Sequence, residues 1–307
     1  MADGTGTTVP VDADAAATPY ERRHLYLPEP DAAPPRMLHE IAAILGRCQE
    51  AQARRRAAVH QAADELGALL ARNGVESTAL AAAPRACGLP PADGSYRVIT
   101  AETGAQREGL AEGALAEAVA HVATPGSAAV GRLPDGTAFA VVHGPTVDLG
   151  EVWQLVAACE PSVPLHGGTT ASPADGPQDL AGALAEARYA LTSARNADPD
   201  ASLLTDITAL TSLDTLLAGV PADVRTAFSR TVLGPLLNTG NASAAPLLHT
   251  LRTFLDCDGS WARTAQALHL HVNTVHYRIQ RIEHFTGRDL SRPADRLDLW
   301  AALLCRS

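Results

Sequence analysis

The chain contains no lysine, few aromatic residues and no long apolar run. All 24 basic side chains among its 307 residues are arginine, and aromatic residues make up only 4%. Because the arginines are scattered, we attribute the missing lysine to composition bias and draw no functional conclusion from it. No apolar stretch approaches the ~18 residues of a membrane-spanning helix, so we expect no membrane partner. The first 19 residues have neither a basic start nor an apolar stretch, and we expect no signal peptide.

Paired cysteines and the common catalytic motifs are missing as well. The five cysteines lie far apart and include no CxxC pair, a pattern typical of reduced thiols in the cytoplasm. His269, His271, His276 and His284 lie near Cys257, but their spacing fits no common structural zinc site. The sequence also lacks a GxSxG motif, a P-loop and an HExxH motif. We therefore expect a cytoplasmic protein that needs no metal and no other cofactor.

Composition and charge divide the chain into four parts. Residues 1–36 are rich in Ala, Asp, Gly, Thr and Pro without periodicity, which predicts a disordered tail. Residues 37–73 predict one long helix, residues 75–237 a mixed α+β domain, and residues 246–307 an all-helical module. Residues 247–307 carry 8 Arg, 6 acidic residues and 5 His, whereas the rest carries 16 Arg and 28 acidic residues. A small basic module on an acidic body is compatible with specific DNA binding.

The long helix has apolar residues at heptad spacing. Gln52 and Arg55 interrupt this series midway. Such spacing is typical of a coiled coil, in which mid-seam polar residues set the register, and equally of an amphipathic helix packed on its own domain. Both alternatives stay open, and the helix is the candidate dimer seam. The two positions of the series are Leu38, Leu45, Val59 and Leu66, and Ile41, Cys48, Ala62 and Leu69.

The middle domain alternates strand and helix patterns in the order βαββαβα. This order predicts a ferredoxin-like sheet covered by helices. The segment between the second and third strands, Leu133-Pro134-Asp135-Gly136, is a hairpin signal. We further expect Leu203–Leu217 and Pro221–Leu237 to be mostly helical. The expected strands are Tyr96–Thr100, Ser127–Arg132, Thr137–His143 and Val163–Thr169, and the expected helices are Arg107–Ala123, Leu149–Cys159 and Pro177–Arg195.

The last module predicts a helix-turn-helix. Pro246–Cys257 is an amphipathic helix, and Ser260 caps a short helix over Trp261–Leu268. A third helix runs from a cap at Asn273 or Thr274 to about Phe285. In this third helix, Val275, Ile279 and Ile282 lie at i, i+4 and i+7 and should face the core.

The opposite side of the third helix is the candidate surface for double-stranded DNA. Asn and Gln side chains pair with adenine and Arg with guanine, while Tyr, Thr and His suit phosphates. A helical bundle with a solvated polar face would explain any one of these residues, but their spacing, the turn and the residue types together favour DNA. The candidate DNA-binding residues are Asn273, Thr274, His276, Tyr277, Arg278, Gln280 and Arg281.

Residues 250–303 resemble the C-terminal helix-turn-helix of PucR/CdaR-type bacterial transcription regulators. The resemblance implies that Asn273–Arg281 is the recognition helix, that the function is regulation of transcription, and that the protein acts as a homodimer on two half-sites. The positions that match the A…L…H.NT..YR…I…TG signature are Ala265, Leu268, His271, Asn273, Thr274, Tyr277, Arg278, Ile282, Thr286 and Gly287.

The middle domain resembles the GGDEF-like domain of the same regulators, over Val130–Val142 and Leu165–Asn196. The resemblance to diguanylate cyclases raises the rival hypothesis of a nucleotide cyclase, which needs carboxylates that hold Mg²⁺ against a triphosphate. Here Asp135 stands where the motif has its first glycine, and Thr137 and Ala138 stand where it has its two acids. The acids expected after the first strand are also missing from Ile99–Ala105. We expect a degenerate, non-catalytic domain.

Three hypotheses for the whole chain follow. The favoured one is a dimeric, sequence-specific DNA-binding regulator, with an unknown small-molecule effector as a possible further partner. The second is a GGDEF protein that makes or binds a cyclic dinucleotide. The third is a protein-interaction module whose helix-turn-helix does not bind DNA. A steep salt dependence of binding would separate the first hypothesis from the third.

Overall fold

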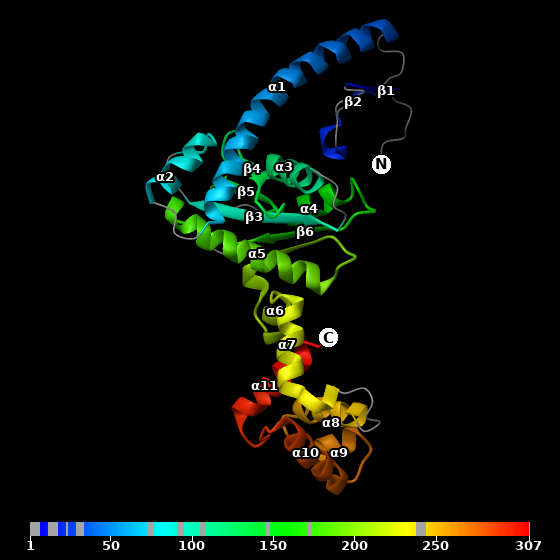
Figure 1. Ribbon diagram of the computed structural model, residues 1–307. Helices are drawn as coiled ribbons and strands as arrows, with labels where there is room; N and C mark the ends of the chain where they lie inside the picture. The colour runs from blue at the N-terminus through cyan, green and yellow to red at the C-terminus, as the bar shows by residue number, and fades with distance from the viewer. Residues whose placement is uncertain are drawn as a thin grey trace. The chain divides into compact units, whose positions relative to one another are not determined.

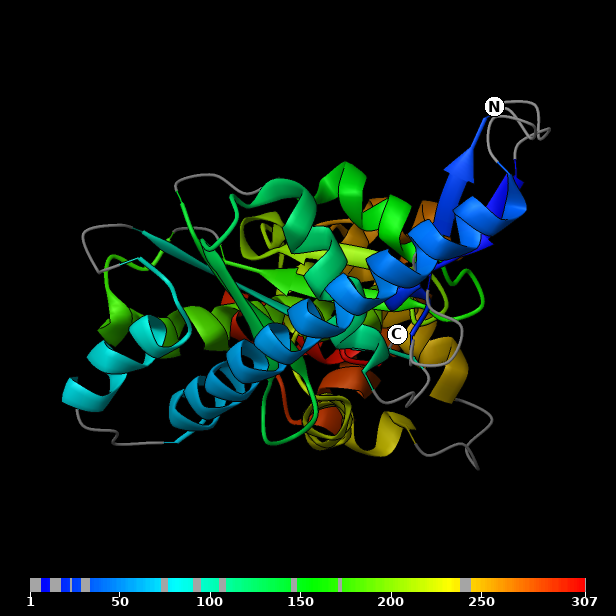
Figure 2. The ribbon, with the colours of Figure 1, turned by 90° about the horizontal axis from the view of Figure 1, so that it is seen from above.

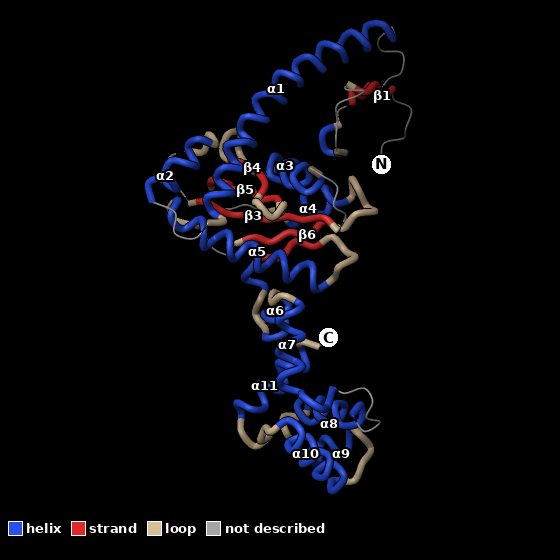
Figure 3. Tube along the Cα trace, in the orientation of Figure 1, coloured by secondary structure: helices blue, strands red, loops and turns tan. Residues whose placement is uncertain are grey.

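The computed structural model divides into two compact units, Met1–Ala209 and Leu210–Ser307. The N-terminal unit contains the β-sheet, and the C-terminal unit is helical (Figures 1 and 3). Within α1 the description of residues 48–58 covers the backbone only. The residues that the structure describes are 7–11, 18–22, 24–28, 34–72, 77–90, 95–104, 109–144, 148–170, 173–237 and 244–306.

The N-terminal unit is organised around a five-stranded sheet with the strand order β4-β5-β3-β6-β7. The first four of these strands pair antiparallel, and β7 joins the β6 edge in parallel. The four antiparallel strands lie close to their predicted positions. The strands are β3 (Tyr96–Thr103), β4 (Ala128–Arg132), β5 (Ala138–His143), β6 (Leu165–Thr169) and β7 (Leu203–Asp206).

Helices cover both faces of this sheet. Two of the helices that connect its strands, α3 (Leu110–Val122) and α4 (Gly150–Ala157), pack on the same face. The other face is covered by α5 (Leu180–Ala197), by the end of α1 (Pro35–Leu70) and by α2 (Ser77–Ala86). The βαββαβ connectivity predicted from sequence is therefore present, with its two crossover helices on one side of the sheet.

Adjacent glycines in β6 allow the two helical layers to approach the sheet closely. A Cβ atom at Gly168 would lie 2.1 Å from the carbonyl oxygen of Ala187 in α5. A Cβ atom at Gly167 would lie 2.5 Å from the indole ring of Trp153 in α4. Because real Cβ contacts are not that short, both positions need glycine for packing, as expected for glycine within a strand that another element approaches.

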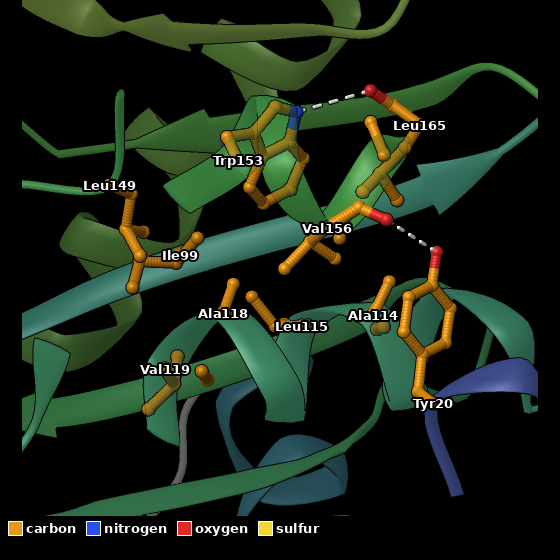
Figure 4. Close-up of a cluster of buried hydrophobic side chains, with 14 of the residues drawn as sticks. Tyr20, Ile99, Ala114, Leu115, Ala118, Val119, Leu149, Trp153, Val156 and Leu165 are labelled. Atoms are coloured by element: carbon orange, nitrogen blue, oxygen red, sulfur yellow. Dashed lines mark hydrogen bonds between the residues drawn. The ribbon is translucent and has the colours of Figure 1, made fainter. Parts of the chain in front are cut away.

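Part of the segment predicted as a disordered tail is structured. Strands β1 (Thr7–Pro10) and β2 (His24–Leu27) form an antiparallel pair, which packs on Leu38 and Ala42 of α1. Between them, the 3₁₀ helix η1 (Pro19–Glu21) buries Tyr20, whose hydroxyl donates to the Val156 carbonyl at 3.2 Å (Figure 4). The prediction rested on the average composition, and the sequence could not show where the patch Tyr20–Leu27 packs. The remaining tail residues lie outside the described part of the chain.

The long helix α1 is buried only in part. Near its C-terminal end, Ala63, Leu66 and Leu70 pack against the sheet. The preceding stretch extends beyond the sheet (Figure 1), and seen from above the helix crosses the unit diagonally (Figure 2). The same side of the helix is exposed there. Its large exposed apolar side chains are Met37, Ile41, Ile44, Leu45 and Val59; the side chains of Cys48, Gln52 and Arg55 lie outside the described part.

The C-terminal unit begins earlier than the sequence predicted. Residues 75–237 were expected to form one domain, but α7 (Ala222–Leu233) and the 3₁₀ helix η4 (Gly234–Leu237) belong to the C-terminal unit. The reason is burial, because Val232, Leu233 and Leu236 lie in the same core as the helix-turn-helix. The unit also contains α6 (Leu213–Ala218), α8 (Ala244–Asp256), α9 (Trp261–Ala267), α10 (Val272–Thr286) and α11 (Pro293–Leu304).

A second correction concerns Leu203–Leu217, which was expected to be mostly helical. Its first residues form β7, followed by the 3₁₀ helix η3 (Ile207–Ala209) and then α6. The strand forms because β6 offers a free edge, and Ser202 adds a hydrogen bond by accepting from the Leu165 amide at 2.9 Å. Local sequence cannot reveal a partner nearly 40 residues away.

We predict that Leu233→Ala destabilises the helix-turn-helix although it lies outside the predicted module. The Leu233 side chain is fully buried, and removing such a side chain from a core costs about 2–5 kcal/mol. Hydrogen-exchange protection of the α8, α10 and α11 amides in the full chain should fall accordingly. Val224→Ala, on the exposed side of the same helix, is the matched control; an equal loss in both variants would contradict this boundary.

Candidate nucleic-acid interface

Helix α10 has one buried side and one exposed side. Val275, Ile279 and Ile282 are at most 1% exposed and pack in the core of the C-terminal unit. At 100° per residue, the opposite side carries Asn273 and Tyr277 together with the other polar side chains of the helix. The predicted core positions are thus confirmed. The exposed residues of this polar side are Asn273, His276, Tyr277, Gln280 and His284.

Helices α8, α9 and α10 form the helix-turn-helix arrangement. The core that joins them includes Leu251 and Phe254 of α8, Ala265 of α9 and Val275 of α10. The predicted cap of α9 is present, since the Ser260 hydroxyl accepts from the Arg263 amide at 3.4 Å. A small side chain at position 265 lets α9 and α10 pack closely.

The turn between α9 and α10 depends on two histidines. His269 adopts the left-handed conformation with φ 53°, and the next residue closes the turn with a hydrogen bond from the Leu270 amide to the Ala265 carbonyl at 2.9 Å. The N-cap of α10 is His271, whose Nδ1 accepts from the Asn273 amide at 3.2 Å. The prediction of Asn273 or Thr274 as the cap is therefore wrong. A ring nitrogen at this position serves the same purpose as a hydroxyl or carboxylate cap.

A ring stack joins α9 to the exposed side of α10. The His276 ring lies parallel to the indole of Trp261, with centroids 3.9 Å apart and an interplanar angle of 14°. Phe254 of α8 also lies against this indole, with 4.8 Å between the ring centroids. The stack holds His276 in place on the surface. Sequence analysis had no signal for Trp261, because a single aromatic residue on a short helix predicts no particular contact.

The candidate residues fall into two groups. Asn273, His276, Tyr277 and Gln280 are exposed, whereas Thr274, Arg278 and Arg281 are half-buried. The Arg278 guanidinium donates from Nη1 to the Thr250 hydroxyl of α8 at 3.1 Å. The Arg281 guanidinium lies 5.9 Å from the Tyr277 ring centroid and 5.4 Å from that of Phe285. Arg278 thus holds α10 against α8, whereas Arg281 borders the exposed side.

Ion pairs fix the loop that follows α10. Arg288 pairs with Asp295 at 3.1 Å and also with Asp298 of α11, and the hydrogen bond that Arg288 donates to the Asp295 carboxylate raises the Arg288 pKa. The Asp289 amide and then Arg288 donate to Asp295 and lower its pKa. Since these groups are only half-buried at the surface of the unit, we assign them a role in the loop geometry only.

Two further properties of the described residues bear on function. No three His, Cys, Asp or Glu side chains in the described part of the chain lie close enough together to hold a metal ion. No helix of the described residues is long and apolar enough to cross a membrane.

Comparison with known proteins identifies this module. Residues 247–305 match the PucR C-terminal helix-turn-helix domain. The chain is 49% identical over 92 residues to an uncharacterized protein in the pkwA 5′ region of Thermomonospora curvata, which is 30% of this chain and 48% of that protein. It is 34% identical over 119 residues to the transcriptional activator PmfR of Paenarthrobacter nicotinovorans, which is 36% of this chain and 25% of PmfR.

The matched part of the chain therefore spans about half of the first relative and a quarter of the second. A solved structure, the regulator of polyketide synthase expression from Bifidobacterium adolescentis, aligns over 81% of this chain and 92% of its own. Its sequence identity is 21% and its TM-score 0.32, which is too weak a likeness to establish a shared fold.

We predict that His269→Gly stabilises the C-terminal unit by about 0.5 kcal/mol. A left-handed backbone strains a non-glycine residue by about 1–2 kcal/mol. Glycine removes this strain, but the greater conformational entropy of the unfolded glycine chain offsets part of the gain in stability. His269→Ala, which keeps the strain, should bring no gain. Urea denaturation followed by Trp fluorescence measures both variants. A glycine variant less stable than the alanine variant would show that the His269 side chain makes a contact of its own.

Proposed function

We propose that the protein is a sequence-specific DNA-binding regulator of transcription, and that α10 enters the major groove. The observation that carries this proposal is the division of α10 into two sides, with Val275, Ile279 and Ile282 holding one side in the core. The other side is polar and exposes the side-chain amides of Asn273 and Gln280. Amide side chains form bidentate hydrogen bonds with adenine, and a helix of this width fits the major groove.

The remaining candidate residues have different roles in this proposal. Arg281, at the border of the exposed side, is available for a guanine or a phosphate. Tyr277, which is 60% exposed, and His276 are suited to phosphate contacts. Thr274 lies in the first turn, where backbone amides attract a phosphate. Arg278 acts as a positioning residue through its hydrogen bond to Thr250.

The match of residues 247–305 to the PucR helix-turn-helix domain supports a role in transcription, and so does the name of the relative PmfR, a transcriptional activator.

The proposed active form is a homodimer joined through α1. One recognition helix contacts only a few base pairs, so helix-turn-helix proteins of this kind bind two half-sites. The helix has 36 residues. Its apolar side packs on the sheet at Leu66, and nearer the N-terminal end of the helix the same side exposes Met37, Ile41 and Ile44. Since the sheet ends before this stretch, a second copy of the same helix is the partner we assign to it.

The proposed role of the N-terminal unit is regulatory and non-catalytic, in a GGDEF-like fold. A cyclase would need free carboxylates at the hairpin between β4 and β5 to hold Mg²⁺. The carboxylate present there, Asp135, accepts from the Thr137 amide at 3.1 Å and pairs with Arg188 of α5. Ala138, which stands at the second acidic position of the cyclase motif, is fully buried. This arrangement supports a structural hairpin and leaves the cyclase hypothesis without a metal site in the described residues.

The first test of the proposed function is a gel-shift series with DNA from the region upstream of the gene that encodes this protein. Gln280→Ala and Arg281→Ala should each weaken binding about tenfold, because each removes one base or phosphate contact worth about 1–3 kcal/mol. Arg278→Ala should lower both DNA affinity and the stability of the unit, since it also frees Thr250. Arg230→Ala, an exposed arginine on α7, is the charge-matched control and should bind as the wild type does.

Salt titration distinguishes DNA binding from a purely protein-binding module. Affinity for DNA should fall steeply with salt, and Arg281→Ala should reduce the slope by about 1 if this residue contacts a phosphate. Wild-type affinity in both Gln280→Ala and Arg281→Ala, or binding that does not respond to salt, would overturn the proposal.

We expect Ile44→Glu to shift the dimer toward monomer. A charge placed in an apolar interface must be desolvated, which should raise the dimer dissociation constant by a factor of about ten or more. Ala43→Glu adds the same charge to the neighbouring exposed position, 100° away around the helix, and should leave the dimer intact. Sedimentation equilibrium of the full chain measures both; a monomeric wild type, or equal dissociation of both variants, contradicts the assignment.

A further inference from the structure

A groove of about 670 Å³ lies in the N-terminal unit, and no residue of the helix-turn-helix lines it. It is lined by the last turn of α1, by α2, by the hairpin between β4 and β5, and by α5. This volume is within the range of about 300–1,000 Å³ that is usual for small-molecule sites. The proposed DNA-binding function gives this groove no role.

The floor of the groove is apolar. It consists of four leucine side chains that come from three different helices, α1, α2 and α5. Two alanines of α5, Ala181 and Ala185, form an open wall beside them and are both exposed. Four leucines at one groove bury the apolar body of a ligand at about 25 cal/mol for each Å² removed from water. The leucines are Leu69, Leu70, Leu80 and Leu184.

The rim of the groove carries two arginines and one aspartate. Arg188 on α5 pairs with Asp135 at the hairpin turn, and the Thr137 amide also donates to Asp135 at 3.1 Å. Although burial tends to raise the Asp135 pKa, these hydrogen bonds and the nearby Arg188 charge lower it below its usual range. Asp135 therefore stays ionised at neutral pH and orients the guanidinium of Arg188.

The second arginine, Arg72, follows the C-terminal end of α1 and is exposed. Within the described part of the chain its guanidinium has neither an ion-pair partner nor a hydrogen-bond acceptor. The rim as a whole thus has one positive charge in excess of the pair between Arg188 and Asp135. An anion held there would gain a charge-assisted hydrogen bond from Arg72, which pairs with carboxylates in a bidentate manner.

We propose that this groove binds a small amphipathic monoanion, with an apolar ring or chain over the leucines and one carboxylate at Arg72. Charge complementarity argues for a carboxylate, because among the described residues the rim offers one unpaired cation, Arg72, beside an apolar floor. Every lining residue belongs to the N-terminal unit. Ligand binding at this site can therefore be tested independently of DNA binding.

The test uses 2-naphthoate as the probe and isothermal titration calorimetry of the full chain. We expect saturable binding of one naphthoate per chain, and about fivefold weaker binding of the uncharged 2-naphthamide, because the amide cannot form the ion pair. Arg72→Met keeps the apolar stem and should weaken naphthoate by a similar factor. Arg85→Met, an exposed arginine on α2 that does not line the groove, should not change the affinity.

A second variant tests the location of the site. Ala185→Trp places an indole in the groove at an exposed helical position, where it should fold normally and abolish naphthoate binding. The proposal is overturned if the wild type shows no saturable binding up to about 10 mM naphthoate, if the Ala185→Trp variant binds as before, or if Arg72→Met and Arg85→Met behave alike.

Discussion

The N-terminal unit depends on the close contact between α5 and β6. The backbone of Gly168 lies so near to Ala187 that no side chain fits between them, and Thr100 of the neighbouring strand strengthens the contact by donating to the Ala187 carbonyl at 3.0 Å. On the other face, Gly167 leaves room for the indole of Trp153, whose Nε1 donates to the Leu165 carbonyl (Figure 4). A strand held from both sides sets where α5 runs, and with it one wall of the groove that we assign to an anion.

The C-terminal unit depends in the same way on the burial of one side of α10. Each of its fully buried aliphatic side chains contributes about 1.5–3 kcal/mol, whereas an exposed ion pair contributes at most about 1 kcal/mol. Apolar packing therefore decides which side of the helix faces outward. Polar contacts then refine the surface: Trp261 holds the His276 ring, and Thr250 holds the Arg278 guanidinium. The sequence placed Arg278 among the residues that contact DNA, but its position beside α8 gives it a structural task as well.

Much of the fold could be predicted because its signals are local. Alternating apolar residues predicted four strands of the sheet, and the i, i+4, i+7 spacing predicted Val275, Ile279 and Ile282 as the core of α10, all of which the structure confirms. The errors concern contacts between distant segments. The edge strand β7 forms only because β6 has a free edge, and Tyr20 is buried only because it packs in the same core as α3 and α4. The cap at His271 was missed because histidine is an uncommon N-cap.

The sequence by itself determined the helix-turn-helix, since the residue types, their spacing and the turn lie within about 40 consecutive positions. The tertiary structure decided where that unit begins, because only burial of Val232, Leu233 and Leu236 shows that α7 and η4 belong to it. It likewise decided the purpose of Gly167 and Gly168, which sequence could not assign, and it brought Arg72, Asp135 and Arg188 to the rim of one groove. The physical reason is the same in each case: side chains far apart in the chain acquire a role only when packing brings them into contact.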